Sequence, residues 1–345
     1  MGDWNKTAVL GAKITIAPDG KSLTASHEDY INLNGKKFGL MDRAPKSRPC
    51  TKETVAKIDN AIRPTAAEME TREWKALYKR FRSILGVIMH IMKWTTPQVI
   101  FAVSVASAYM SCPCKVALAF VEDIMLYLIG VKNKPMLITR QFENTENWIF
   151  GMSDLDWGGR PGRRSQTCYL YFLFGNLVGW CSRRQPSVSL GSAGGEYQAL
   201  CAAACFGIWL VRLVNEIGIV KQTPLKIYCD NQSAIAISEN PVHHKYTKHI
   251  DMRQSWLKEA VRNMQIKVLY VKTAMNTSDI GTKAVSKVVF KDFADALLGY
   301  RKLKVSPDHK CMSFEELHTS ICGIGFWAIY KCSEFEELAA DYPSL

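Results

Sequence analysis

The chain has 345 residues, which is enough for two compact units that each bury a hydrophobic core. Hydrophobic residues make up 48% and charged residues 22%, close to the averages of folded globular proteins, and this excludes a fibrous or mainly disordered chain. The 44 Lys and Arg exceed the 32 Asp and Glu, giving a net charge of +12 that favours a polyanionic partner through phosphate contacts.

The first half of the chain predicts a short β region followed by helices. Residues 8–26 alternate apolar and polar around Asp19-Gly20, which predicts two strands joined as a hairpin. Residues 41–75 are polar, basic and interrupted by Pro, which is typical of a connecting segment with little fold of its own. Helical periodicity then predicts a small bundle of three helices, over Tyr78–Trp94, Gln98–Met110 and Lys115–Val131.

The second half predicts a sheet with helices around it. Three strands of an antiparallel meander are predicted at 148–157, 167–175 and 177–184. Further along come a helix at 192–215, a strand at 225–230, two shorter helices, a strand at 266–272 and a last helix at 278–298. We therefore expect an α/β fold with a mixed five-stranded sheet flanked by helices, preceded by a small helical region.

The cysteines and the apolar stretches indicate a compartment. The eleven cysteines are scattered, and Cys112 and Cys114 lack the second pair that a zinc site needs, so we interpret them as reduced thiols. The apolar stretch Trp94–Cys114 is diluted by Thr, Pro, Gln and Ser, and we interpret it as buried helix. No apolar signal core follows Met1. We expect an intracellular protein, cytoplasmic or nuclear, that does not bind a membrane.

Four acidic residues lie at the ends of predicted elements: Asp154, Glu196, Asp230 and Asp279. Ends of adjacent strands, and starts of the helices that follow them, are where α/β sheets build sites. Carboxylates crowded together raise one another's pKa unless cations neutralise them, and their oxygens favour Mg²⁺ or Mn²⁺. Two such ions promote phosphodiester hydrolysis. Taken singly, each residue fits a turn residue or a helix cap better than a metal ligand, and the pattern alone leaves that alternative open.

The sequence segments that contain these residues give a more specific indication of function. The segments MSDLDWGG, SRRQPSVSLGSAGGEYQALCAA, IYCDNQSAIAISENPVHHKYTKHIDMR and TSDIGTKAV follow one another between residues 152 and 285. In order and spacing they resemble the RNase H domain of the copia-type LTR retrotransposon Pol polyprotein. The resemblance implies an RNase H-like fold and an endonuclease that cuts the RNA strand of RNA–DNA hybrids, leaving 3′-hydroxyl and 5′-phosphate ends. It implies that the catalytic, metal-binding residues are Asp154, Glu196, Asp230 and Asp279. They would bind two Mg²⁺ ions, with Mn²⁺ as a substitute and no small-molecule cofactor.

The first half resembles the end of the reverse transcriptase of the same polyprotein, through LGAKITIAPDGKSLTASHEDYI and YKRFRSILGVIMHIMKWTTPQVIFAVSVASAYMSCP. The adjacent Asp pair of the family's polymerase site does not occur in this sequence. We interpret the chain as a truncated polyprotein without the polymerase active site, which an upstream polymerase fragment would complement. The regions expected are 1–146, a reverse-transcriptase remnant with a thumb-like helical part; 147–300, the RNase H-like domain; and 301–345, a tail of unknown role.

Several residues depart from the family pattern. Gly194 stands where the family has an acidic residue, Ser255 and Trp256 stand for a His and an aromatic residue, and Gly281 replaces a Phe. We interpret these changes, and the glycine pair ending at Gly195, as decay that loosens the helix start. They leave open an inactive nucleic-acid-binding remnant as the alternative. A DNA-transposing relative of the same fold is a third hypothesis, and the fourth carboxylate argues against it.

The polar residues near these motifs also have predicted roles. Asp156 faces the same side of its strand as Asp154, so it is an alternative first ligand or a support for it. Asp251 is interpreted as a cap or ion-pair partner. The HHxxxxH run at His243, His244 and His249 lacks helical zinc-site spacing and is interpreted as a surface or phosphate contact. Predicted contacts with the backbone and 2′-hydroxyls of a hybrid are Arg163, Arg164, Arg183, Arg184, Asn231, Gln232, Lys245 and Lys248.

Overall fold

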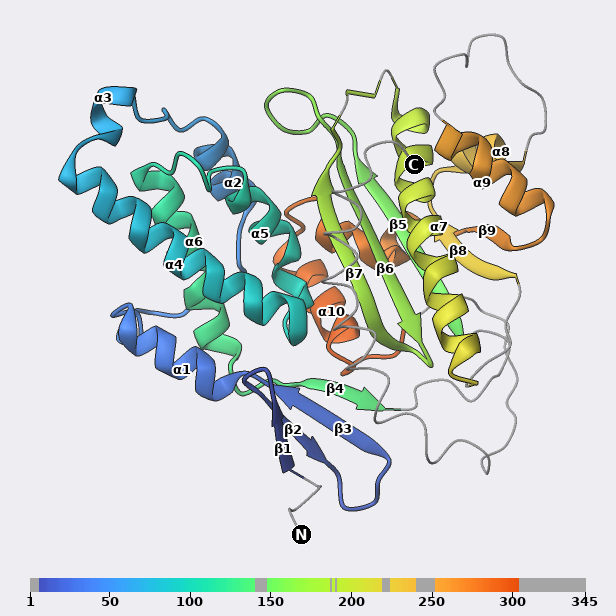
Figure 1. Ribbon diagram of the computed structural model, residues 1–345, viewed down its shortest axis with the longest axis horizontal. Helices are drawn as coiled ribbons and strands as arrows, with labels where there is room; N and C mark the ends of the chain where they lie inside the picture. The colour runs from blue at the N-terminus through green and yellow to red at the C-terminus, as the bar shows by residue number, and fades with distance from the viewer. Residues whose placement is uncertain are drawn as a thin grey trace. The chain divides into compact units, whose positions relative to one another are not determined.

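The computed structural model of the chain describes residues 6–139, 148–186, 188–189, 191–218, 224–239 and 252–303 (Figure 1). The described residues divide into two compact units. The first contains residues 6–139 together with 283–301, and the second contains the described residues between 148 and 282 together with 302–303.

The first unit has an antiparallel sheet with the strand order β1-β2-β3-β4. Its strands are β1 (Lys6–Val9), β2 (Ala12–Ile16), β3 (Ser22–Ser26) and β4 (Met136–Thr139). The predicted hairpin is β2–β3, and β1 adds a strand that the sequence pattern did not predict. The turn between β1 and β2 places Leu10 and Gly11 at φ values of 50° and 80°, and leucine is a rare residue in that conformation.

The helices of the first unit are more numerous than predicted. They are α1 (Glu28–Lys37), α2 (Lys52–Asp59), α3 (Ala66–Met69), α4 (Arg72–Trp94), α5 (Ile100–Ser107), α6 (Lys115–Val131) and α10 (Lys287–Leu297). Helices α4, α5 and α6 pack on one another as the predicted bundle. The apolar stretch from Trp94 is divided between the end of α4, the 3-10 turn η1 (Pro97–Val99) and the eight-residue helix α5.

The expectation of little structure over residues 41–75 is wrong. Helices α2 and α3 both lie there, and each begins with a reciprocal pair of hydrogen bonds between the residue before the helix and the third residue inside it. In α3, the Glu68 carboxylate accepts from the Thr65 backbone N–H at 2.7 Å, and the Thr65 hydroxyl accepts from the Glu68 N–H. These caps satisfy N–H groups that a short polar helix otherwise leaves without partners.

The second unit confirms the predicted mixed sheet, which has the strand order β7-β6-β5-β8-β9. Strands β7, β6 and β5 are antiparallel neighbours, and β8 and β9 continue the sheet parallel to β5. The strands are β5 (Ile149–Asp156), β6 (Gln166–Leu173), β7 (Asn176–Arg184), β8 (Leu225–Cys229) and β9 (Ile266–Tyr270). Helices α7 (Ser192–Glu216), α8 (Gln232–Glu239) and α9 (Met252–Arg262) complete the unit, and α7 runs along the sheet in Figure 1.

Helix α7 is long and apolar enough to cross a membrane by length and composition, but it is the core helix of this unit. Its residues Leu200, Ala203 and Leu210 are fully buried in one cluster with the sheet. The Tyr171 ring lies between Gly151 of β5 and Gly207 of α7, where an added Cβ would come within 2.6 Å or less of it. Its hydroxyl donates to the Ala203 carbonyl oxygen at 2.6 Å. Glycine therefore allows the helix to approach the sheet closely.

The predicted last helix is in fact two elements that belong to different units. The 3-10 helix η5 (Thr277–Gly281) lies in the second unit, and α10 lies in the first. Near α10, the Leu137 N–H donates to the Leu298 carbonyl at 2.9 Å, and Lys134 forms an ion pair with Asp295. The unit that contains the predicted carboxylates includes the described residues up to Thr282 and also 302–303, whereas residues 283–301 belong to the first unit.

Candidate metal centre

Asp154 and Asp230 follow from the pairing of two neighbouring parallel strands. Ser153 of β5 is the register partner of Cys229 of β8. The residues that follow them, Asp154 and Asp230, therefore lie side by side near the carboxyl ends of the two strands. Neighbouring strands are about 4.8 Å apart. Asp154 is 2% exposed, whereas Asp230 follows the end of its strand and is partly exposed. The carboxyl ends of two strands thus bring two carboxylates together.

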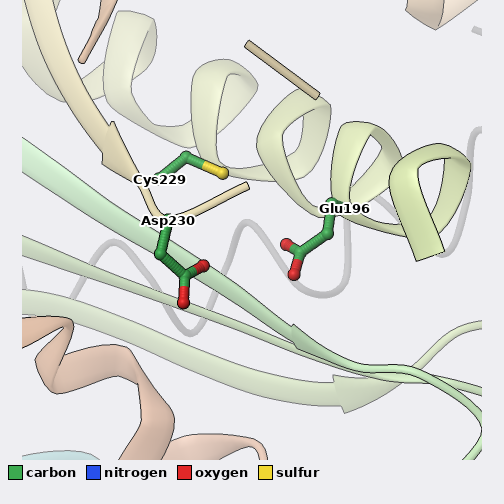
Figure 2. Close-up of side chains that lie close together, drawn as sticks. All are labelled: Glu196, Cys229 and Asp230. Carbon is green, nitrogen blue, oxygen red and sulfur yellow. The ribbon is translucent and has the colours of Figure 1, made fainter. Parts of the chain in front are cut away.

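Glu196 comes to the same place from the first turns of α7. One ligand atom each from Glu196, Cys229 and Asp230 lies within 4.8 Å of the other two. In Figure 2 the carboxylates of Glu196 and Asp230 face a common space, with the Cys229 thiol beside them. Glu196 is 7% exposed, so its carboxylate belongs to a nearly closed environment.

Gly195 explains how α7 comes so close to β5. A Cβ at this position would lie 2.6 Å from Leu155 Cδ2 and 3.1 Å from Ser189 Oγ. A Cβ at Gly194, in contrast, would meet nothing within 4 Å. The interpretation of Gly195 as decay is therefore wrong, because its missing side chain lets the first turn of the helix lie against the strand that bears Asp154. Gly194 has no such packing reason.

Asp279 is held near Asp154 by the polar residues that flank η5. The Thr282 hydroxyl donates to the Asp154 carboxylate and lies 3.2 Å from the Asp279 carbonyl oxygen. The Asn276 amide donates to the Ser153 carbonyl at 3.0 Å, which attaches the same segment to β5. Asp279 is 7% exposed. It was expected at the start of a long helix, and it lies instead in a short 3-10 turn.

Two buried thiols report the charge of this region. The pKa of Cys229 is raised to about 12, first by burial and then by the negative charges of Glu196, Asp230 and Asp154. The pKa of Cys168 is raised well above its usual value by burial, by Cys181, and by the charges of Asp154 and Asp279. Asp154 contributes to the raised pKa of both thiols, together with Glu196 and Asp230 at Cys229 and with Asp279 at Cys168. Among the described residues, the close group contains Glu196, Cys229 and Asp230, and Asp154 and Asp279 lie outside it.

The donor set fits a hard divalent cation. Carboxylate oxygens are the ligands that Mg²⁺ and Mn²⁺ prefer, and four of them concentrate enough charge to need neutralising. The Cys229 thiol is protonated at neutral pH because its pKa is about 12, so it offers little to a hard cation. Asp156 stands apart from the close group: its carboxylate lies over the backbone of Gly159 in the β5–β6 loop.

The predicted nucleic-acid contacts are placed in part. Arg163, Arg164 and Arg183 are exposed on the β5–β6 loop and on β7. The partly buried Arg184 donates to the Pro161 carbonyl oxygen, so it also holds that loop. The Asn231 side chain accepts from the Ala234 N–H at 3.0 Å and caps α8, a structural role that the sequence prediction did not include.

Most of the remaining predicted residues lie outside the described part of the chain. Gln232 is exposed in the first turn of α8. Lys245, Lys248, Asp251 and the three histidines at 243, 244 and 249 lie outside the described residues. Sequence reasoning missed the supports Asn276 and Thr282, which flank Asp279 at three residues on either side. That symmetric spacing around an acidic residue is the signal that would have found them.

No protein-family model matches the chain. It is 32% identical over 284 residues to the retrovirus-related Pol polyprotein from transposon TNT 1-94 of Nicotiana tabacum, covering 82% of this chain and 21% of that protein. It is 29% identical over 218 residues to the retrovirus-related Pol polyprotein from transposon RE1 of Arabidopsis thaliana, covering 63% of this chain and 15% of that protein. The chain thus spans about a fifth or less of the length of these two polyproteins.

Among solved structures, the chain is similar to a foamy viral protease-reverse transcriptase in complex with an RNA/DNA hybrid. The sequence identity is 13%, the TM-score is 0.35, and the match covers 78% of this chain and 29% of that one.

Proposed function

Because the chain belongs to the retrovirus-related Pol polyproteins of copia-type transposons, we propose that its second unit is an RNase H-like nuclease that hydrolyses the RNA strand of RNA–DNA hybrids. The observation that supports the proposal is that Glu196 and Asp230 meet in one close group, while Asp154 follows the register partner of Cys229 and accepts from Thr282 beside Asp279. These four carboxylates are the residues for which the family motifs imply metal binding. In the mixed sheet, β5 and β8 are neighbouring inner strands, and their carboxyl ends bear Asp154 and lead to Asp230.

Each of the four carboxylates has a distinct place in the proposed site. Glu196 and Asp230 face a common space and would share a cation between them. Asp154 links them to Asp279 and is itself oriented by the Thr282 hydroxyl. When bound, two Mg²⁺ or Mn²⁺ ions supply an activated water and stabilise the leaving oxygen of the phosphodiester. No other side chain is required as a nucleophile.

The substrate follows from charge and from the exposed arginines. A net charge of +12 favours a polyanion, and Arg163, Arg164 and Arg183 are free to reach solvent beside the β5–β6 and β7 ends. Arginine contacts with phosphates position a duplex without reading its sequence. Discrimination between a hybrid and a DNA duplex needs contacts with 2′-hydroxyls and with the shape of the helix, for which the exposed Gln232 amide is available.

The test is cleavage of a labelled RNA–DNA hybrid by the full chain in Mg²⁺, with DNA and RNA duplexes as comparison substrates. Asp230→Asn is expected to lower the cleavage rate by about 10³-fold or more, since catalytic ions contribute several kcal/mol to transition-state stabilisation. Asp156→Asn is the matched control, because this carboxylate lies over Gly159 and outside the close group. Its rate should stay within a few-fold of wild type.

Three outcomes separate the hypotheses. Cleavage of the hybrid that disappears in Asp230→Asn and persists in Asp156→Asn supports the nuclease. Binding of the hybrid without cleavage, by wild type and both variants alike, supports the inactive remnant that the departures at Gly194 and Gly281 left open. Cleavage that survives Asp230→Asn shows that the activity does not use this group of carboxylates.

A further inference from the structure

Gln185 connects three elements of the second unit through its side chain. It follows the end of β7 and is 5% exposed. Its amide nitrogen donates to the Thr167 hydroxyl and to the Gly195 carbonyl oxygen, both at 3.0 Å. Its amide oxygen accepts from the Ser189 hydroxyl at 2.9 Å. Both halves of a buried amide are therefore satisfied, as burial of such a group requires.

These contacts end at the residue before Glu196. Helix α7 begins without help from its own N-cap, because Gly191 has no side chain to accept a hydrogen bond from the first turn. Two glycines also stand in that turn, at 194 and 195, and glycine gives a helix start little stiffness. The first turn of α7 is thus fixed from outside, by Gln185 on the Gly195 carbonyl and by Leu155 packed against Gly195.

The hydrogen-bond partners of Gln185 are themselves held by the sheet and by residues next to its strands. Thr167 lies in β6, the direct neighbour of the strand that bears Asp154, and it is 3% exposed. The Gln185 backbone N–H donates to the Ser165 carbonyl at 2.8 Å, which ties the end of β7 to the same strand region. The Trp157 indole donates to the Ser189 carbonyl at 3.1 Å and so holds the residue whose hydroxyl donates to Gln185. Through Gln185, the positions of Thr167 in β6 and of Ser189 therefore fix the start of α7 relative to the sheet.

We infer that Gln185 is a positioning residue that holds the Glu196 carboxylate in register with Asp154 and Asp230, and that it thereby sets the affinity of the centre for divalent cations. The inference rests on the proposed function and adds the residue that controls its metal dependence. Supports of this kind, one contact away from a ligand, typically change metal affinity or activity by about 10–100-fold when they are removed.

The experiment compares two buried amides at opposite ends of the β6–β7 hairpin. Gln185→Met keeps the length of the side chain and removes its hydrogen bonds. Asn176→Leu does the same at the far turn, where the Asn176 amide donates to the Phe174 carbonyl at 3.1 Å. A third variant, Gln185→Glu, keeps the acceptor for Ser189 and loses the donor to Gly195. Melting temperature, hybrid cleavage over a Mg²⁺ titration, and Mn²⁺ binding by calorimetry are measured for each.

The expected result is a separation of stability from metal dependence. Both Gln185 variants should need about 10–100-fold more Mg²⁺ for half-maximal cleavage, with an unchanged KM for the hybrid at saturating Mg²⁺. Asn176→Leu should lose stability and keep the wild-type Mg²⁺ midpoint. Equal Mg²⁺ midpoints in wild type and Gln185→Met would overturn the inference and leave the nuclease proposal intact.

Calorimetry keeps the two proposals distinguishable. If the wild-type chain does not cleave hybrids, the proposed function fails, and the Mn²⁺ affinities still decide the role of Gln185. Weaker Mn²⁺ binding in both Gln185 variants than in Asn176→Leu supports the positioning role. Equal Mn²⁺ affinities, or no Mn²⁺ binding by wild type, overturn it.

Discussion

The two compact units differ in what they bury. In the described part of the first unit the buried polar residues are neutral or basic, and none of them is acidic. Its partly buried acid Glu122 is matched by Arg80 at 2.8 Å and Arg43 at 2.7 Å. The second unit buries three acidic residues, Asp154, Glu196 and Asp279, and one basic residue, Arg160. Matched charges stabilise a fold, whereas clustered like charges cost stability and mark a site that needs a cation.

The sharpest test of this comparison exchanges one glutamate in each unit. Glu196→Gln should abolish hybrid cleavage, by about 10³-fold or more, because it removes a carboxylate from the proposed metal centre. It should also raise the melting temperature measured without divalent ions, since one like charge is lost. Glu122→Gln should leave cleavage unchanged and cost about 1 kcal/mol of stability, as for other partly exposed ion pairs.

Melting curves with and without Mg²⁺ and a cleavage assay give both readouts. The comparison breaks if Glu122→Gln loses activity at full stability, or if Glu196→Gln is the less stable protein in the absence of metal. Either result would mean that buried charge does not distinguish the functional unit from the supporting one.

The next largest effect concerns the glycine pair at the start of α7. Gly195→Ala forces a Cβ to within 2.6 Å of Leu155, and overpacking of this kind costs about 1–3 kcal/mol. Gly194→Ala meets nothing within 4 Å and should gain up to about 1 kcal/mol from helix propensity. Urea denaturation of the two variants measures the opposite signs. If both substitutions stabilise, the helix does not pack against β5 as closely as described.

Much of the second unit was predictable from the sequence because its signals are local. Gly-containing turns marked the bounds of β5, β6 and β7, and α7 and α8 followed from periodicity and from the residues that flank them. The family motifs then identified the four carboxylates as candidates. What could not be predicted depends on contacts between distant residues. Strand β4 pairs Met136 with Ala25, more than a hundred residues earlier, and a four-residue strand has too little pattern to announce itself.

The sequence contains a cap signal at Ser286 that divides the last predicted helix, but helical periodicity outweighed it in the prediction. The Ser286 side chain accepts from the Val289 N–H at 3.4 Å and starts α10 there. Apolar residues on both sides continue the helical period, so periodicity favoured one long helix over two elements. The role of Gln185 could not be predicted from the sequence, because only the fold brings its side chain to the Gly195 carbonyl.

The smallest expected effect lies in the first unit and concerns acid. His27 is 2% exposed, its Nδ1 lies 2.8 Å from the Thr95 hydroxyl, and its ring packs edge-on against His90. Burial, opposed by the Leu10 carbonyl and aided by the nearby His90, lowers the pKa of His27 from 6.5 to about 4. The folded state therefore favours the neutral ring, and that stability is complete above pH 6.5 and is lost as pH falls from 6.5 towards 4.

Between pH 7 and pH 5 the wild-type chain should lose on the order of 1 kcal/mol more stability than His27→Gln, which has no group to protonate at this position. Denaturation at the two pH values measures the difference, and the comparison of pH slopes cancels the cost of the substitution itself. Equal slopes would show that His27 is accessible to protons in the folded first unit. Because the carboxylate centre is common to both proteins, its own titration does not enter the difference.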